Sequence, residues 1–206
     1  MIERRKVLAG GLAAAAGAAL PVGAHERGEG YELPEEFMPR LVRLKTRLEP
    51  GELHVEPNIF ALYWTLPGNR AVRYAVGIGR KNLYHPGTYF VGDRKEWPPW
   101  RPTPAMLERD PQAYADFLEG GKYEDGWMPG GIDNPLGARA LYLHQPGRGD
   151  TFLRIHGTSD PRTIGVAVSN GCARLINEHV IDLYERVPLG TRVVLHPKAG
   201  AGPAHS

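Results

Sequence analysis

Cys172 is the only cysteine of the 206-residue chain and lies in residues 169–174, Ser-Asn-Gly-Cys-Ala-Arg. A single cysteine has three interpretations: an inert buried thiol, half of an intermolecular disulfide, or a nucleophile. A nucleophilic cysteine needs a base nearby, because the thiolate is the attacking species. His156, sixteen residues earlier, is the leading candidate, because it ends an expected strand to which the following loop can return. On spacing alone, a structural histidine beside a buried thiol fits as well.

The residues beside Cys172 favour the nucleophile. Gly171 lets the backbone approach closely or adopt unusual dihedral angles next to the thiol. The N–H groups of Gly171 and Cys172 could form an oxyanion hole for a tetrahedral intermediate. Arg174 is a permanent cation that could hold a substrate carboxylate and favour the thiolate. A surface ion pair is the alternative for Arg174.

Metal chemistry has little support in the sequence. The chain has eight histidines, but they show neither an HExxH motif nor a His/Cys ligand spacing. One cysteine excludes a multi-thiolate zinc site within one chain. The sequence therefore predicts neither a metal nor another cofactor.

The first 24 residues predict a signal peptide. Arg4, Arg5 and Lys6 precede the uncharged residues 7–20, and Val-Gly-Ala at 22–24 offers a cleavage site of small residues. The apolar run is shorter than the roughly 20 residues needed to span a bilayer. The arginine pair favours twin-arginine export, with Sec export or a cytosolic helix as alternatives. We expect a protein of the periplasm or cell wall with no integral membrane segment after cleavage.

The charge of the remaining chain argues against nucleic acid as a partner. Three of the 25 Lys and Arg and one of the 23 Asp and Glu fall within residues 1–24. The rest of the chain is therefore balanced in charge, whereas a nucleic-acid-binding domain carries a basic patch.

In an oxidising compartment cysteines usually occur in pairs, so an unpaired Cys172 points to intermolecular pairing or a free reactive thiol.

Strands dominate the expected fold. Gly and Pro are frequent, at 26 and 19, which favours strands and turns over a helical bundle. Short helical segments are expected at 35–48, in a lead-in covering 25–51, and within 105–118. A clearer helix is expected at 177–187, capped by Asn177, with an apolar stripe of Val180, Ile181, Tyr184 and Val187. The expected strands are 58–66, 71–78, 88–92, 138–144, 151–156 and 191–196. The fold class is thus mainly β, a sandwich or barrel with one late helix.

A long insertion and a tail complete this organisation. Residues 93–137 are rich in Pro and Gly and are expected to form a lid or binding loop, or else a partly disordered insertion. Residues 197–206 are expected to be a disordered tail.

Two segments carry a family resemblance. Ile-His-Gly-Thr at 155–158, followed by residues 169–174, resembles the signature of the bacterial L,D-transpeptidases with a YkuD-type catalytic domain. Residues 74–80, 134–140, 163–165 and 190–191 also fit, so the resemblance covers a catalytic domain at 52–196. Chain order argues against papain-type peptidases, in which Cys precedes His. Sortases have a longer separation between His and Cys.

The resemblance implies a β-rich fold and a Cys–His site acting on peptidoglycan stem peptides. Cys172 would attack a tetrapeptide donor, release D-Ala and form a thioester that an amine then resolves. His156 would be general base and then general acid, oriented by the Gly157 carbonyl. Asn170, where many members have His, could donate to the oxyanion with Gly171 and Cys172. The substrate-binding residues would be Ser169 and Arg174.

Three other functions stay open for the same chain, which we expect to be a monomer. Water as the acceptor would make the protein an L,D-carboxypeptidase, and a protein substrate would make it a wall-protein-releasing hydrolase. A non-catalytic peptidoglycan-binding module would keep the fold without needing Cys172, His156 and Arg174.

Overall fold

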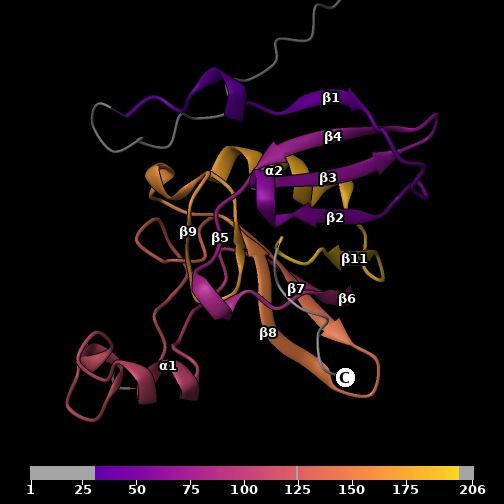
Figure 1. Cartoon of the computed structure of the whole chain (residues 1–206). Coiled ribbons are helices and arrows are strands. Elements are labelled where there is room, and N and C mark those ends of the chain that lie inside the picture. The colour runs from indigo at the N-terminus through magenta and orange to yellow at the C-terminus, as the bar shows by residue number, and fades with distance from the viewer. Residues whose placement is uncertain (1–30, 124, 200–206) are drawn as a thin grey trace, which may run out of the picture.

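The computed structural model describes residues 31–123 and 125–199 (Figure 1). The predicted signal peptide at 1–24 and residues 200–206 of the predicted tail lie outside this part of the chain. The strands are β1 (Arg40–Arg43), β2 (Leu53–Glu56), β3 (Ala61–Leu66), β4 (Arg70–Ala75), β5 (Ile78–Gly79), β6 (Gly87–Glu96), β7 (Arg139–Gln145), β8 (Gly149–His156), β9 (Ala167–Ser169), β10 (Ala173–Arg174) and β11 (Arg192–Leu195). The α-helices are α1 (Pro104–Arg109) and α2 (Asn177–Arg186), and the 3-10 helices are η1 (Glu35–Phe37), η2 (Pro57–Ile59), η3 (Lys81–Leu83), η4 (Ala115–Phe117) and η5 (Pro161–Thr163).

Nine strands form one sheet in the order β1-β4-β3-β2-β11-β6-β7-β8-β10, and β5 pairs with β9 in a second, two-stranded sheet. The late strand β11 joins the two halves of the large sheet, because it runs parallel to β2 and antiparallel to β6. The mainly β fold with one main helix is therefore confirmed.

A backbone bridge connects strands from opposite ends of the large sheet. The Gly77 N–H donates to the Arg174 carbonyl at 2.9 Å, and the Arg174 N–H donates to the Gly77 carbonyl at 2.8 Å. Gly77 follows β4 near one edge, whereas Arg174 belongs to β10 at the other. The sheet therefore curls partly closed, in a barrel-like manner, with β10 held between β8 and Gly77.

One hydrophobic core fills the space between the two halves of the sheet and α2. Leu53 of β2, Leu141 of β7, Ile155 of β8 and Leu183 of α2 are all fully buried. Burying a side chain of this size stabilises the fold by roughly 1.5–3 kcal/mol. This shared core fixes β8, and with it His156, against the first half of the chain.

Helix α2 forms where the sequence predicts it, but Asn177 is not its cap. The N-cap residue is Ile176, and Asn177 is the first helical residue. The Asn177 Oδ1 instead accepts a hydrogen bond from the Ala138 N–H at 2.9 Å. Within the expected stripe, Ile181 is only half-buried, whereas Leu183 is fully buried. The Asn177 side chain thus ties the helix to the start of β7.

The helix predicted over residues 35–48 is wrong. Only η1 is helical there, and β1 pairs antiparallel with β4, placing Leu41 opposite Val72. Pro39 explains the early end of the helical turn, because a proline disfavours the helical conformation of the preceding residue. Met38 is accordingly extended, with ψ of 145°. The chain then covers an edge of β4 that would otherwise leave backbone groups unpaired.

The insertion between β6 and β7 has a small aromatic cluster of its own. Trp100 contacts the Phe117 ring edge-on, with ring centroids 5.0 Å apart, and Phe117 contacts Tyr123 at 4.7 Å. Thr103 caps α1 by accepting from the Met106 N–H at 3.3 Å. Figure 1 shows α1 well away from β1–β4, beyond the β8 side of the sheet. The insertion is therefore a structured cap on that side.

The segment after β11 contacts the domain where the tail was expected to begin. Lys198 Nζ donates to the carbonyls of Gly79 at 2.9 Å and Lys81 at 3.0 Å. The Ala199 N–H also donates to Asn58 Oδ1 at 2.8 Å.

Candidate active site

The parallel pairing of β10 with β8 brings the predicted site residues together. Arg174 lies opposite His156, and the Leu175 N–H donates to the His156 carbonyl at 2.9 Å. Paired residues share a face of the sheet and side chains alternate along a strand. Cys172, two residues before Arg174, therefore faces the same side as Arg154, two residues before His156. All four side chains line one pocket.

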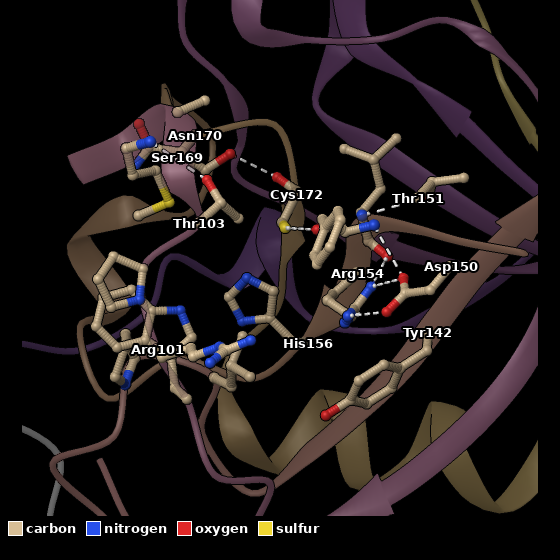
Figure 2. A pocket seen from close by; sticks show the side chains of 18 of the residues that line it. Arg101, Thr103, Tyr142, Asp150, Thr151, Arg154, His156, Ser169, Asn170 and Cys172 are labelled. Atoms are coloured by element: carbon tan, nitrogen blue, oxygen red, sulfur yellow. Dashed lines mark hydrogen bonds and ion pairs between the residues drawn. The ribbon is translucent and has the colours of Figure 1, made fainter. Parts of the chain in front are cut away.

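This pocket lies between β7, β8, the turn before β10 and the insertion, and has a volume of about 1380 Å³. His156 and Cys172 both line it, and Figure 2 shows their side chains among those of the pocket. Its charged lining is Lys95, Arg101, Arg109, Arg148, Asp150, Arg154 and Arg174. The single acid in this lining, Asp150, is neutralised by Arg154, whose Nη1 and Nη2 donate to its two oxygens at 2.6 and 2.7 Å. The pocket therefore favours an anionic ligand.

The His156 ring is held in one neutral tautomer. Its Nδ1 lies 2.6 Å from the Gly157 carbonyl oxygen, which only accepts, so Nδ1 carries the proton and Nε2 carries the lone pair. The ring is 3% exposed. Burial lowers the pKa of His156 to about 3, the Arg174 charge acts in the same direction, and the Gly157 carbonyl opposes both. The imidazole is therefore uncharged at neutral pH.

Cys172 is a free, half-buried thiol. Its Sγ lies 3.9 Å from the Phe152 carbonyl oxygen. Burial raises the pKa of Cys172, although the positive charges of Arg154 and Arg174 act in the opposite direction. The thiol and the imidazole are therefore both uncharged at neutral pH, so a nucleophilic role for Cys172 would require a proton transfer from the sulfur.

Ser169 shapes the turn that presents Cys172. Its Oγ donates to the Cys172 carbonyl at 2.6 Å and accepts from the Gly171 N–H at 3.2 Å. Gly171 has φ of 132°, and a Cβ there would lie 2.9 Å from the Leu83 carbonyl oxygen, so only glycine fits. The Gly171 N–H, expected in the oxyanion hole, thus bonds to Ser169. Within the described residues, no backbone acceptor is found for the Cys172 N–H.

Asn170 contacts the insertion instead of facing the thiol. Its Oδ1 accepts from Arg109 Nη2 at 2.8 Å and, more weakly, from Arg80 Nη2 at 3.5 Å. Its Nδ2 donates to the Tyr114 hydroxyl at 3.3 Å. The oxyanion role of Asn170 stays a prediction that would require the carboxamide to leave these partners.

The structure adds pocket residues that the sequence reasoning missed. Arg154 stacks on the Tyr142 ring, with Cζ 3.9 Å from its centroid, while it pairs with Asp150. Period-two spacing back from His156 could have identified Arg154. The same spacing reaches Phe152, which has φ of 61° and is 59% exposed. A register shift between β7 and β8 next to Phe152 explains why its side chain points outward at the pocket.

The described residues lack a membrane-spanning helix and a metal-binding cluster. Residues 31–123 and 125–199 contain no helix long and apolar enough to cross a membrane. No group of three or more His, Cys, Asp or Glu in the same residues is arranged to hold a metal ion.

Known proteins share both the sequence pattern and the fold. The model of the family "YkuD: L,D-transpeptidase catalytic domain" matches residues 52–195. A protein of Fuscovulum blasticum, "Putative L,D-transpeptidase in ATP synthase subunits region ORF 5", is 32% identical over 93% of this chain and 96% of its own length.

Two solved structures resemble this chain. The Mycobacterium tuberculosis L,D-transpeptidase 3 is 15% identical, with a TM-score of 0.50, over 70% of this chain and 60% of its own. A Brucella melitensis structure, "Probable carnitine operon oxidoreductase caia", is 43% identical, with a TM-score of 0.52, over 77% of this chain and 93% of its own.

Proposed function

The chain belongs to the YkuD L,D-transpeptidase catalytic domain family, and we propose that it is an exported enzyme that modifies peptidoglycan stem peptides. One observation carries this proposal. The pairing of β10 with β8 puts Cys172 in the pocket of His156, whose Nδ1–H is held by the Gly157 carbonyl. The name of the Brucella protein describes an oxidoreductase, which is another kind of reaction. The assignment made for this chain depends on Cys172 and His156 and not on that name. Export rests on the signal-like residues 1–24.

The first half of the reaction forms a thioester. His156 Nε2 takes the thiol proton as Cys172 Sγ attacks the carbonyl carbon at the L-centre of diaminopimelate in a donor tetrapeptide. The oxyanion forms near the Cys172 N–H. His156 then returns the proton to the amide nitrogen, the C–N bond breaks, and D-Ala leaves as the free amine.

The second half transfers the acyl group to an acceptor amine. The amine nitrogen attacks the thioester carbonyl, His156 takes a proton from it, and the C–S bond breaks. The proton returns to the sulfur, so the products are a new amide and the free Cys172 thiol. The basic pocket supports this assignment, because stem peptides carry carboxylates.

Product analysis with the purified protein and a disaccharide-tetrapeptide tests the proposal. We expect released D-Ala, cross-linked dimers and an intact mass increased by the acyl group. Cys172→Ser should give none of these while unfolding in urea like the wild type. Cross-linking by Cys172→Ser would overturn the mechanism. A tripeptide without dimers would identify a carboxypeptidase, release of a wall protein would identify a hydrolase, and binding without turnover or thiol reactivity would identify a binding module.

A further inference from the structure

Two arginines from distant parts of the chain converge on one neutral oxygen, the Oδ1 of Asn170. Asn170 belongs to the turn of residues 169–172 that presents Cys172, called the nucleophile turn below. Arg109 Nη2 lies 2.8 Å and Arg80 Nη2 lies 3.5 Å from Asn170 Oδ1. Arg80 lies between β5 and η3, whereas Arg109 ends α1 in the insertion. The function proposed above assigns no role to either arginine.

The position of Arg80 relative to the nucleophile is fixed by backbone contacts. The Arg80 N–H donates to the Ser169 carbonyl at 3.0 Å. A Cβ on the preceding Gly79 would lie 3.0 Å from the Gly171 Cα, so the two backbones are in close contact. Since Asn170 is two residues before Cys172, the point of convergence is close to the thiol.

The charges at this point are not balanced by acids. Among residues 31–123 and 125–199, neither Arg80 nor Arg109 forms an ion pair with a carboxylate. Two guanidinium groups sharing one amide oxygen repel each other. A carboxylate would remove this repulsion and offer each arginine an oxygen of its own, in hydrogen bonds roughly twice as strong as those to a neutral acceptor.

We propose that Arg80 and Arg109 form a carboxylate-binding subsite above the nucleophile turn, where a substrate carboxylate replaces Asn170 as their acceptor. This subsite rests on the proposed function, because its ligand is a carboxylate of the stem peptide. Arg174 lines the pocket on the β10 side and is available for a different carboxylate.

Alkylation of Cys172 by two small reagents tests the subsite without any peptide. Iodoacetate carries a carboxylate and iodoacetamide is neutral, and the mass of the product reports on Cys172 alone because it is the only thiol. The ratio of the two rates cancels changes in thiolate fraction and in access. We expect the ratio to fall about threefold to fivefold in Arg80→Gln/Arg109→Gln, the range of an exposed ion pair.

Arg101→Gln/Arg148→Gln is the matched control, because both arginines line the same pocket and their substitution also removes two positive charges. The ratio should fall less in this variant. An equal fall would overturn the subsite in favour of a diffuse positive field. Equal changes in both rates in Arg80→Gln/Arg109→Gln, with an unchanged ratio, would also overturn the subsite. The Arg109–Asn170 contact would then only hold the insertion against the turn. Thermal unfolding confirms that each variant is folded.

Peptide turnover separates failure of the subsite from failure of the proposed function. Donor tetrapeptides with the diaminopimelate side-chain carboxylate free or amidated are compared. We expect the double substitution to raise KM for the free form about threefold to fivefold and to leave KM for the amidated form unchanged. If the wild type turns over neither peptide, the proposed function fails while the alkylation ratio still decides the subsite. If the wild type turns over both and the variant has the same KM values, the subsite alone fails.

Discussion

His156 is oriented by its own chain neighbour, Gly157, whose carbonyl oxygen lies 2.6 Å from the ring Nδ1. A Cβ at Gly157 would lie 2.4 Å from Asn177 Oδ1 and 3.0 Å from the Ala138 nitrogen. The same Asn177 oxygen accepts from the Ala138 N–H. The orientation of His156 therefore depends on a close contact among three chain segments that only glycine allows.

Gly157→Ala should reduce activity and stability together. The added methyl pushes the backbone away from Asn177, which costs about 1–3 kcal/mol, the usual penalty for overpacking. A shift of about 1 Å in the Gly157 carbonyl misplaces His156, so kcat/KM for the tetrapeptide donor should fall up to roughly 100-fold. Gly131→Ala is the control, because a Cβ at this position would have no atom within 4 Å. Wild-type kcat/KM in Gly157→Ala would contradict this role of the carbonyl.

The free thiol should titrate above its ordinary range. Burial raises the pKa of Cys172 despite the charges of Arg154 and Arg174. The iodoacetamide alkylation rate should therefore keep rising with pH beyond the ordinary thiol pKa of about 8.5. A plateau reached at or below neutral pH would show instead that the resting enzyme holds a thiolate–imidazolium pair.

His156 should make the fold less stable in mild acid. Its folded pKa of about 3 lies below the unfolded value of 6.5, so the unfolded chain binds a proton that the folded protein excludes. The free energy of unfolding should therefore decrease as pH falls from 6.5, by up to about 1.4 kcal/mol per pH unit.

Urea unfolding between pH 6.5 and 5 measures this slope. Burial also lowers the pKa values of His54 and His179, so only the difference between wild type and His156→Gln isolates His156. The slope of His156→Gln should be flatter. Parallel slopes for the two proteins would show that His156 takes up a proton in the folded state.

Local patterns predicted the parts of the fold that depend on neighbouring residues. The strand pattern predicted β8, and the apolar stripe predicted α2. Because His156 ends β8 and the following loop is long enough to return, Cys172 was expected to lie near the end of that strand. The strand β1 was missed because its conformation depends on the open edge of β4, which no local pattern reveals. The role of Asn177 was missed for the same reason, since its partner Ala138 lies 39 residues away.

The site shows the same division. His156, Gly157, Cys172 and Arg174 could be selected because they stand in two short motifs. The side chains of His156, Cys172 and Arg174 line one pocket, and the Gly157 carbonyl bonds the His156 ring. The partners of Asn170 come from the insertion, whose path cannot be inferred from its Pro-rich and Gly-rich sequence. They emerge only when α1 is placed over the turn.

Replacing Phe152 with glycine should raise the stability of the fold and lower its activity. A non-glycine residue at φ of 61° is strained, and this side chain is 59% exposed, so its removal loses little burial. Phe152→Gly should therefore gain up to about 1 kcal/mol of unfolding free energy, or a few degrees in Tm. Because the ring lines the pocket next to Cys172, kcat/KM for the tetrapeptide should fall in the same variant.

Leu189→Gly is the matched control for Phe152→Gly. Leu189 is 61% exposed but is not among the residues with positive φ, so glycine relieves no strain there. This variant should be about 0.5–1 kcal/mol less stable, from the added freedom of glycine in the unfolded chain, with unchanged activity. A Phe152→Gly enzyme that is more stable and fully active would show that the ring of Phe152 has no role in substrate binding. The positive φ at this position would then be only a consequence of the register shift between β7 and β8. If both variants lose stability equally, the left-handed conformation of Phe152 stores no strain.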